Sequence, residues 1–414
     1  MNNTSTISQA SYFIELEDQY GAHNYHPIPV VLERGEGVYV YDVEGKQYFD
    51  FLSAYSAVNQ GHCHPKIISA LIEQASQLTL SSRAFYNNRL GEYEKYICEY
   101  FGYDKVLPMN TGVEGVETAL KLCRKWAYQV KEIPDLEAKI IVLEGNFHGR
   151  TMTAVSASND PSSYKGFGPF LPGLIRIPYN DLDALKSVIK DPHVAGFLIE
   201  PIQGEAGVVV PDDDYLKTAF DLCQSNRVLF IADEIQTGIA RTGKLLACDH
   251  INIRPDILIL GKALSGGVLP VSAVLADDEI MLCIKPGEHG STFGGNPLAC
   301  AVGIAALEVV RDEQLEKNAQ IMGDFFRQGL QQLSKKHPII KIIRGKGLLN
   351  AIVIDDHEES STAWNLCIEM AQQGLLAKPT HGNIIRLAPP LTITQDQLET
   401  ALSMIDRAFT NLGY

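Results

Sequence analysis

The sequence predicts an α/β protein in which a large domain, built on a mostly parallel central sheet flanked by helices, precedes a smaller α+β domain. From about residue 105, short and continuously apolar runs alternate with amphipathic stretches, which is typical of parallel strands buried on both faces and joined by helices. After Pro297 the pattern changes to long helices followed by short strands. We therefore predict an N-terminal segment at 1–50 that packs with the small domain, the large domain at 51–296 and the small domain at 297–414.

Before the α/β region, the sequence predicts a meander and two helices. Residues 36–52 alternate aromatic and polar residues, which indicates a β-hairpin or meander. Apolar residues recur at helical spacing over 65–80, and a second helix is expected over 90–100. Within the α/β region a crossover helix is expected over 213–226. The runs expected as buried parallel strands lie at 139–145, 196–201, 227–234, 256–262 and 272–276.

The small domain is predicted from the last part of the chain. An apolar-periodic helix is expected over 298–310, and a charged helix should follow it. Short strands are expected around 339–343, 348–354 and 384–387.

Composition narrows the classes of partner. The net charge of −15 argues against binding to nucleic acid or to an anionic membrane surface, because both need clustered Lys and Arg. The apolar runs are shorter than the ~20 residues of a membrane-spanning helix. The 8 cysteines are spread along the chain without a C-x-x-C pair, which indicates reduced thiols in a cytosol-like compartment. Because the N-terminus has no signal or presequence pattern, we predict a cytoplasmic protein, unless a presequence has been removed.

Polar residues follow three of the predicted strands, at the strand ends where open parallel sheets bind ligands. Asp233 and Lys262 each follow an apolar run, and the segment 145–150 follows a third. A desolvated lysine becomes a nucleophilic amine, as a Schiff base requires. From the local pattern alone, Lys262 is as readily explained as a solvated loop lysine, and Asp233 as the cap of a following helix.

Together, Lys262 and Asp233 favour chemistry with pyridoxal 5′-phosphate (PLP). This cofactor needs a lysine for covalent attachment and a carboxylate that keeps its ring nitrogen protonated, so that the ring can accept electrons. It also needs a phosphate site of backbone N–H groups and small hydroxyls at the start of a helix. The segment 110–115, which contains Thr111 and Gly112, fits that need. The alternative is an ordinary helix capped by Thr111.

Other motifs receive little weight. The segment 238–244 matches the first seven positions of a P-loop, but Leu245 stands where Mg²⁺ binding needs Ser or Thr. The segment 345–350 begins like a dinucleotide-binding fingerprint and lacks its third glycine. The His-Cys-His sequence at 62–64 looks like a metal cluster, but adjacent side chains do not easily converge on one ion. We expect a turn there and predict no metal site.

Several longer motifs lie in order along the chain: YGAHNYHPIPVVLERGEG, NTGVEGVETALKLCRKW, EGNFHGRT, LIEPIQGEAGV, FIADEIQTGIARTGKL, DILILGKALSGG and GEHGSTFGGNPLAC. This set resembles the ω-aminotransferases of PLP fold type I, also called the class III aminotransferases. The resemblance runs from about residue 20 to about residue 391. The N-terminal part is similar to the ornithine aminotransferase branch of that family.

The resemblance implies which residues hold the cofactor. Lys262 and Asp233 would be catalytic, because Lys262 would bond covalently to PLP and Asp233 would pair with the ring nitrogen. Gln236 would reach the ring hydroxyl, while Phe147 and Ile235 would flank the ring faces. The further residues implied at the cofactor are Thr111, Gly112, His148, Glu200, Ser291 and Thr292.

Two of these residues imply an assembly. Ser291 and Thr292 resemble the family segment that reaches the phosphate of the neighbouring subunit, which implies a homodimer with shared active sites. The chain departs from the family pattern at Gly115 and Val116, which bears on helix packing beside the phosphate.

The resemblance also implies the substrate-binding residues. Tyr25 and Arg150 would hold the α-carboxylate of ornithine far from the cofactor, which leaves the δ-amine at the reactive carbon, and Tyr55 would line the same pocket. Arg386 would bind the α-carboxylate of glutamate or 2-oxoglutarate, since an Arg–carboxylate pair is bidentate and directional. Glu205 would pair with Arg386 while ornithine is bound. The implied reaction transfers the δ-amino group of ornithine to 2-oxoglutarate.

Two alternatives remain open at this point. The nearer one is an ω-aminotransferase that acts on N-acetylornithine or 4-aminobutyrate, and Tyr25 and Tyr55 favour ornithine over these. The other is a catalytically idle protein that binds PLP. The intact set of Lys262, Asp233 and Arg386 argues against it.

Overall fold

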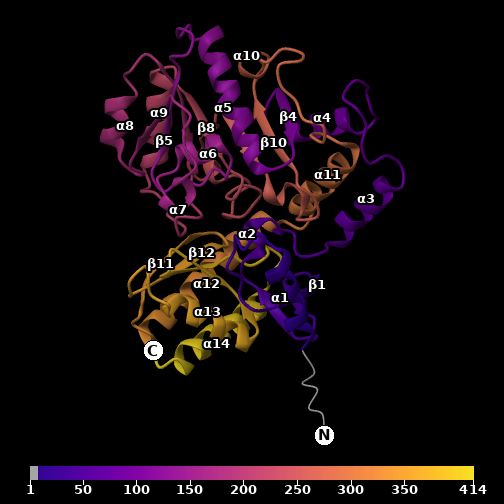
Figure 1. Ribbon diagram of the computed structural model, residues 1–414, viewed down its shortest axis with the longest axis vertical. Coiled ribbons are helices and arrows are strands. Elements are labelled where there is room, and N and C mark those ends of the chain that lie inside the picture. The colour runs from indigo at the N-terminus through magenta and orange to yellow at the C-terminus, as the bar shows by residue number, and fades with distance from the viewer. Residues whose placement is uncertain (1–7) are drawn as a thin grey trace.

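The computed structural model describes residues 8–414. The chain forms two bodies that meet along one boundary, as Figure 1 shows. The upper body in that view holds the large sheet, and the lower body combines the C-terminal elements with the N-terminal segment. The active-site residues discussed below come from both bodies.

The N-terminal segment begins with helix α1 (Gln9–Tyr20), which the sequence reasoning did not predict. Three antiparallel strands follow it: β1 (Leu32–Glu36), β2 (Tyr39–Asp42) and β3 (Gln47–Asp50). They confirm the meander predicted over 36–52. Strand β3 also pairs in parallel with the short strand β13 (Leu375–Leu376), so the N-terminal segment shares a sheet with the C-terminal part of the chain.

The central sheet of the upper body has the order β4-β10-β9-β8-β7-β5-β6 within residues 8–414. Its strands are β4 (Lys105–Met109), β5 (Lys139–Leu143), β6 (Leu174–Ile177), β7 (Val194–Ile199), β8 (Leu229–Asp233), β9 (Ile257–Leu260) and β10 (Ser272–Ala276). The five predicted apolar runs all form strands of this sheet, and β7, β8, β9 and β10 are buried along their whole length. That burial explains why these runs lack polar alternation.

One expectation about this sheet was wrong. The run at 272–276 was predicted as a parallel strand, but β10 runs antiparallel to both β4 and β9. A strand buried on both faces has the same apolar pattern whichever way it runs, so the pattern does not report direction. Strands β5, β6, β7, β8 and β9 pair in parallel as predicted.

Helices surround the central sheet, some packed directly on its strands and others on neighbouring helices. They are α3 (Pro65–Ala75), α4 (Leu90–Phe101), α5 (Gly112–Gln129), α6 (Met152–Ala157), α7 (Pro161–Tyr164), α8 (Leu182–Val188), α9 (Tyr215–Ser225), α10 (Asp278–Met281) and α11 (Pro297–Asp312). Helices α4, α9 and α11 confirm the predictions at 90–100, 213–226 and 298–310. Helix α3 ends at Ala75, short of the predicted residue 80.

The lower body has a second sheet of order β11-β12-β15-β14 in the described part of the chain. Its strands are β11 (Ile340–Lys346), β12 (Leu349–Ile354), β14 (Lys378–Thr380) and β15 (Ile384–Leu387). Helices α12 (Leu315–Lys336) and α13 (Thr362–Gln373) pack on it, and α14 (Gln395–Asn411) packs on those two helices. Strands β11, β12 and β15 confirm the three short strands predicted for the small domain.

The boundary between the domains at residue 296 stays a prediction. Helix α11 packs mainly against α3 and α4 of the upper body and less against α12. Between residue 8 and the C-terminus, no helix has both the length and the hydrophobicity needed to cross a membrane.

Candidate active site

Parallel strands of the central sheet end at one edge, and a cavity of about 190 Å³ lies there. Its lining residues come from the segments after β4, β5, β7, β8 and β9, as expected for an open parallel sheet. They are Gly112, Val113, Phe147, His148, Gly149, Glu200, Ile202, Glu205, Asp233, Ile235, Gln236, Thr237 and Lys262. Nine of these were predicted from the sequence, whereas Val113, Gly149, Ile202 and Thr237 were not.

Lys262 begins the short 3₁₀ helix η2 (Lys262–Ser265), directly after strand β9. Its φ of +46° lies in the left-handed region, an uncommon conformation that recurs at functional sites. Its side chain lines the cavity. Burial lowers the pKa of Lys262 from its ordinary value, although the carboxylates of Glu205 and Asp233 oppose the shift. A lysine with a lowered pKa is uncharged more of the time at neutral pH, so its amine is more available as a nucleophile than that of a lysine in water.

Asp233 forms a buried pair with His148. The imidazole Nδ1 and Asp233 Oδ2 are 2.7 Å apart, and both side chains are almost completely buried. Burial alone would lower the pKa of His148, but the hydrogen bond with Asp233 outweighs it, so the pKa lies above its ordinary value. The hydrogen bond from His148 therefore orients the carboxylate of Asp233, which faces the cavity.

Glu200 follows strand β7 on the same side of the cavity. Its Oε1 accepts a hydrogen bond from the backbone N–H of Phe147 at 2.8 Å, which ties the segment after β7 to the segment after β5. Burial raises the pKa of Glu200 to about 7, despite the opposing charge of His148. Glu200 therefore titrates near neutral pH, next to the group that would hold the cofactor ring.

The lining of the cavity fits PLP. Phe147 and Ile235 offer apolar surfaces for the faces of a flat ring, and Asp233 and Lys262 supply the carboxylate and the amine that the cofactor needs. His148 Nε2 is a buried nitrogen with no hydrogen-bond partner in the described residues. At Gly112, an added Cβ would approach the side chain of Ile235 to 3.0 Å and narrow this space.

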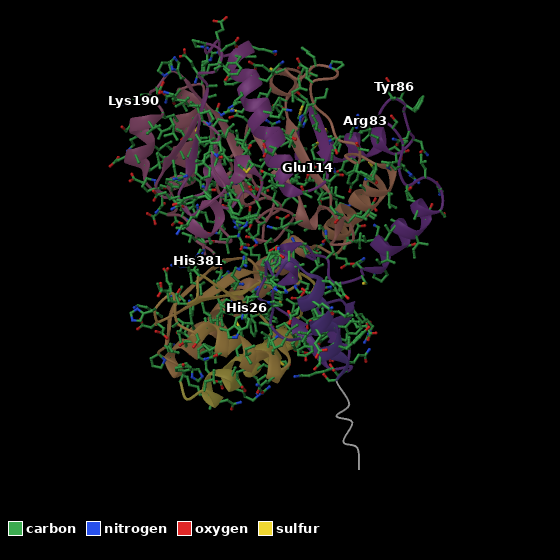
Figure 2. All side chains as sticks on the ribbon, viewed as in Figure 1. His26, Arg83, Tyr86, Glu114, Lys190 and His381 are labelled. Atoms are coloured by element: carbon green, nitrogen blue, oxygen red, sulfur yellow. The ribbon has the colours of Figure 1, made fainter. Side chains whose placement is uncertain are left out.

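The start of helix α5 would hold the phosphate group. Thr111 is the helix N-cap, and its side chain and that of Glu114 form a capping box, so the ordinary cap considered as an alternative is present. The first helical residues, Gly112 and Val113, line the cavity, whereas Thr111 is exposed beside it. Glu114 lies at this end of α5 within the upper body in Figure 2. The N-cap of α5 lies next to the cavity. The same helix start can therefore be an ordinary capped helix and also a site for the phosphate group.

Gly149 lines the cavity but was not predicted as a site residue. Its φ is +121°, and a Cβ on this residue would collide with the side chain of Val113. The glycine therefore allows the segment after β5 to approach the start of α5 closely. A glycine between His148 and Arg150 was the available clue, but the sequence does not say which segment it approaches.

Glu205 and Arg386 form an ion pair at the wall of the cavity. Arg386 Nη1 donates to Glu205 Oε1 at 2.5 Å, and the arginine is 5% exposed. Burial raises the pKa of Glu205, but the charge of Arg386 outweighs it, so the pKa lies below its ordinary value. The guanidinium carbon of Arg386 lies 5.0 Å from the ring centre of Tyr55, within cation–π range. The structure thus brings together three residues that the sequence placed far apart.

Tyr25 and Arg150 line a second cavity, of about 440 Å³, together with Ser163. Arg150 Nη1 donates to Ser163 Oγ at 2.8 Å, and its guanidinium carbon lies 5.3 Å from the ring centre of Phe147. Phe147 lines the first cavity, so Arg150 stands close to both. His381, beside strand β14, lies at the boundary between the two bodies in Figure 2.

Ser291 and Thr292 lie outside the first cavity. Ser291 Oγ accepts a hydrogen bond from Asn110 Nδ2 at 2.8 Å, next to the start of α5, and Thr292 is exposed. Their role toward a neighbouring subunit stays a prediction.

The His-Cys-His sequence at 62–64 and the P-loop-like segment 238–244 have structural contacts of a different kind from those that the motifs suggest. His62 pairs with Asp50 and His64 with Glu313, and no cluster suited to a metal ion occurs within residues 8–414. In the segment 238–244, the side chain of Arg241 is fully buried.

Comparisons with known proteins agree with this geometry. Residues 20–409 match the family model described as aminotransferase class-III. A rat protein described as ornithine aminotransferase, mitochondrial, is 62% identical over 398 residues, which cover 96% of this chain and 90% of that protein. The crystal structure of an ornithine aminotransferase from Toxoplasma gondii has a TM-score of 0.96 at 48% identity, covering 98% of this chain and 96% of that chain. A structure described as acetylornithine aminotransferase, from Elizabethkingia anophelis, has a TM-score of 0.90 at 60% identity, covering 98% of this chain and 100% of that chain.

Proposed function

Because the chain belongs to the class III aminotransferases, we propose that it transfers the δ-amino group of L-ornithine to 2-oxoglutarate. The products are L-glutamate and glutamate 5-semialdehyde, which cyclises to pyrroline-5-carboxylate. The observation that carries the proposal is the arrangement of two arginines around one lysine. Arg386 is paired with Glu205, whereas Arg150 faces a separate outer cavity.

The cofactor is PLP. When bound, it supplies an electron-accepting ring that stabilises negative charge on the substrate carbon. Lys262 would hold it covalently, Asp233 would hold its ring nitrogen protonated, and Gln236 would reach the ring hydroxyl. The residues Phe147 and Ile235 would enclose the ring faces.

Lys262 also moves the proton. Its lowered pKa leaves a larger fraction of the amine uncharged, and an uncharged Nζ takes the proton from the Cδ atom of ornithine. Lys262, as the acid, would then deliver that proton to the cofactor rather than back to Cδ. The hydrogen bond from His148 holds the carboxylate of Asp233 in place during this exchange.

The two arginines select which amine reaches Lys262. Ornithine has one α-carboxylate, which Arg150 and Tyr25 bind in the outer cavity, so the δ-amine at the other end of the substrate enters the first cavity. The Glu205–Arg386 pair prevents the α-carboxylate from binding close to Lys262. In the second half-reaction 2-oxoglutarate brings a carboxylate that replaces Glu205 on Arg386. One site therefore accepts a δ-amine and an α-keto acid in turn.

The active form is a homodimer with sites shared between subunits. Ser291 and Thr292 reach the phosphate of the neighbouring subunit, and Thr292 is exposed on this chain. Arg83 and Tyr86 stand on a loop at the outer edge of the large domain in Figure 2, and Phe85 and Tyr86 are exposed there. Exposed aromatic residues of this kind favour an interface. Light scattering on the holoenzyme measures the mass, and a monomer would contradict the proposal.

The cellular location stays a prediction. The composition favours the cytoplasm, whereas the rat relative is described as mitochondrial. Fractionation of the producing cells distinguishes the two.

The nearest rival substrate is N-acetylornithine, because one similar structure is described as an acetylornithine aminotransferase. The deciding experiment compares kcat/KM for ornithine, N-acetylornithine and 4-aminobutyrate with 2-oxoglutarate as acceptor. We expect ornithine to be preferred by at least about tenfold, because N-acetylornithine replaces the charged α-ammonium group of ornithine with a larger, neutral amide, and 4-aminobutyrate is one carbon shorter between its amine and its carboxylate. A preference for N-acetylornithine would keep the family and overturn the substrate.

A further inference from the structure

The chain makes a left-handed turn at α2 (Ser53–Ser56), directly after strand β3. The φ angles of these four residues are +50°, +46°, +60° and +72°, and none of the four is glycine. A left-handed conformation costs roughly 1–2 kcal/mol per non-glycine residue. Such a turn persists only when its surroundings determine it, and residues of this kind gather at functional sites.

The side chains of the turn do not hold it in place. In the part of the chain that the structure describes, Ser53 Oγ and Ser56 Oγ are buried without a hydrogen-bond partner. Backbone hydrogen bonds from Tyr55 to Leu52 and from Ala57 to Ser53 close the turn. Asp50 anchors its start, because Asp50 Oδ1 accepts hydrogen bonds from the backbone N–H groups of Leu52 and Ser53, each at 2.8 Å. Asp50 thus determines where the chain leaves strand β3.

His62 holds Asp50 in turn. Its Nε2 lies 2.8 Å from Asp50 Oδ2, the carboxylate oxygen that does not contact the turn. The backbone of His62 pairs in both directions with Gly37, at 3.0 and 2.8 Å. The ring lies against Gly35, where an added Cβ would come within 2.9 Å of the imidazole. The imidazole is therefore fixed between the N-terminal meander and the carboxylate.

The turn carries Tyr55 to the active site. The centre of its ring lies 5.0 Å from the guanidinium carbon of Arg386, and its carbonyl oxygen accepts a hydrogen bond from Gln236 Nε2 at 3.3 Å. Gln236 lines the first cavity, and Arg386 belongs to the ion pair at its wall. A shift of the turn would therefore move Tyr55 relative to the substrate-binding arginine.

We propose that the Asp50–His62 pair is a positioning device that holds the left-handed turn and so sets the place of Tyr55 against Arg386. This inference rests on the proposed function, in which ornithine is the substrate of the pocket that the family resemblance assigns to Tyr55. His62 touches neither substrate nor cofactor and acts through Asp50 and Tyr55. Because Lys262 and Asp233 are held by other elements, the device governs substrate binding more than the chemical step.

The test uses two substitutions of similar size. In His62→Gln, the amide nitrogen takes the position of the imidazole Nε2 and can still donate to Asp50. In His62→Asn, the shorter side chain places its nitrogen where Nδ1 was and loses that bond. For His62→Asn we expect KM for ornithine to rise by roughly tenfold, as for a misplaced substrate contact, while kcat changes by less than about twofold. His62→Gln should stay close to wild type, and so should the control His64→Asn, which removes only the bond to Glu313.

A double-mutant cycle separates this role from a merely structural one. In a Tyr55→Ala background, His62→Asn should produce no further rise in KM, because the residue it positions is gone. An equal rise in both backgrounds, a fall in kcat alone, or identical behaviour of His62→Gln and His62→Asn would overturn the inference. If His62→Asn does not fold, Asp50→Asn breaks the same link, because it places an amide N–H opposite the His62 donor.

The same experiment distinguishes a wrong substrate assignment from a wrong role for the Asp50–His62 pair. Wild-type holoenzyme that does not turn over ornithine counts against the substrate, and the cycle is then run with N-acetylornithine or whichever amine the enzyme accepts. Coupling between His62 and Tyr55 in that cycle supports the positioning device, and its absence refutes it.

Discussion

Arg386 Nη1 donates to Glu205 Oε1 at 2.5 Å, which joins strand β15 of the small domain to the segment that follows strand β7 of the large domain. The pair stands at the wall of the cavity that contains Lys262. A carboxylate of the protein thus occupies the arginine that is best placed to bind a substrate carboxylate. The pair explains how one site can reject an α-amino acid in one half-reaction and accept an α-keto acid in the next.

The first prediction concerns Glu205. In Glu205→Ala, Arg386 has no carboxylate partner, so glutamate should become a better amine donor relative to ornithine by at least roughly tenfold. The measurement is the ratio of kcat/KM for the two donors in the first half-reaction. Glu144→Ala, which removes an exposed carboxylate at the same edge of the sheet, is the control. An unchanged ratio in Glu205→Ala would refute the switch.

The second prediction concerns Lys262. Lys262→Ala should lose turnover by at least about 10²–10⁴-fold, because both the covalent attachment and the proton transfer are lost. PLP should still bind, held by Asp233 and the start of α5, and should then be removable by dialysis. Lys262→Arg keeps a cation and should be equally inactive. Substantial turnover in either variant would remove Lys262 from its role.

The third prediction concerns pH and Glu200, whose pKa rises from its ordinary 4.5 to about 7 on burial. Between these values the folded protein holds a proton that the unfolded chain has released, so the stability contributed by Glu200 falls as pH rises through this window. The full shift corresponds to about 3 kcal/mol. Gln does not ionise, so its contribution to stability does not change with pH. The thermal midpoint of cofactor-free Glu200→Gln should therefore rise relative to that of wild type between pH 5 and about pH 8.

The control for this experiment is Glu144→Gln, which removes one exposed carboxylate without touching the cavity. A difference between Glu200→Gln and wild type that stays constant with pH would show that Glu200 does not titrate in this window.

The fourth prediction concerns Arg241, which joins the two bodies. Its guanidinium donates to Asn59 Oδ1 and to the carbonyl oxygens of Leu348 and Pro389 at 2.6–3.1 Å, and the side chain is fully buried. Arg241→Met leaves these oxygens without a donor, at a cost of about 1–3 kcal/mol for each buried one. The thermal midpoint should fall by several degrees. Lys244→Met, at a half-exposed position on the same segment, should leave it unchanged, and an equal midpoint in both variants would contradict the prediction.

Much of the fold was predictable because its strands are buried on both faces. The strands β5, β7, β8 and β9 stand out as apolar runs, and the polar residues after them lie at the edge where the cavity is. Strands β4 and β6 were missed because each is short and carries half-exposed residues, and β4 also contains Pro108. The direction of β10 was missed because burial on both faces leaves the same pattern in either direction.

Some residues of the candidate site could be predicted from the local sequence, and others could not. Lys262 and Asp233 could be predicted from the sequence, because each follows an apolar run that is recognisable as a strand and each has a side chain that PLP chemistry needs. Glu205 and Arg386 were identified through the family resemblance, because nothing local shows that the two meet. The left-handed turn at 53–56 was missed, as its sequence Ser-Ala-Tyr-Ser has no Gly, Asn or Asp to indicate a positive φ.

The most direct test of the central claim is to add ornithine alone to the purified holoenzyme and identify the product of a single half-reaction. Transfer of the δ-amine predicts that the visible absorption band of the lysine-bound cofactor disappears, that pyrroline-5-carboxylate forms in equal amount and that 2-oxoglutarate restores the band. Formation of pyrroline-2-carboxylate, the cyclised product of α-transfer, would contradict the account. So would a band that persists with ornithine and disappears with N-acetylornithine.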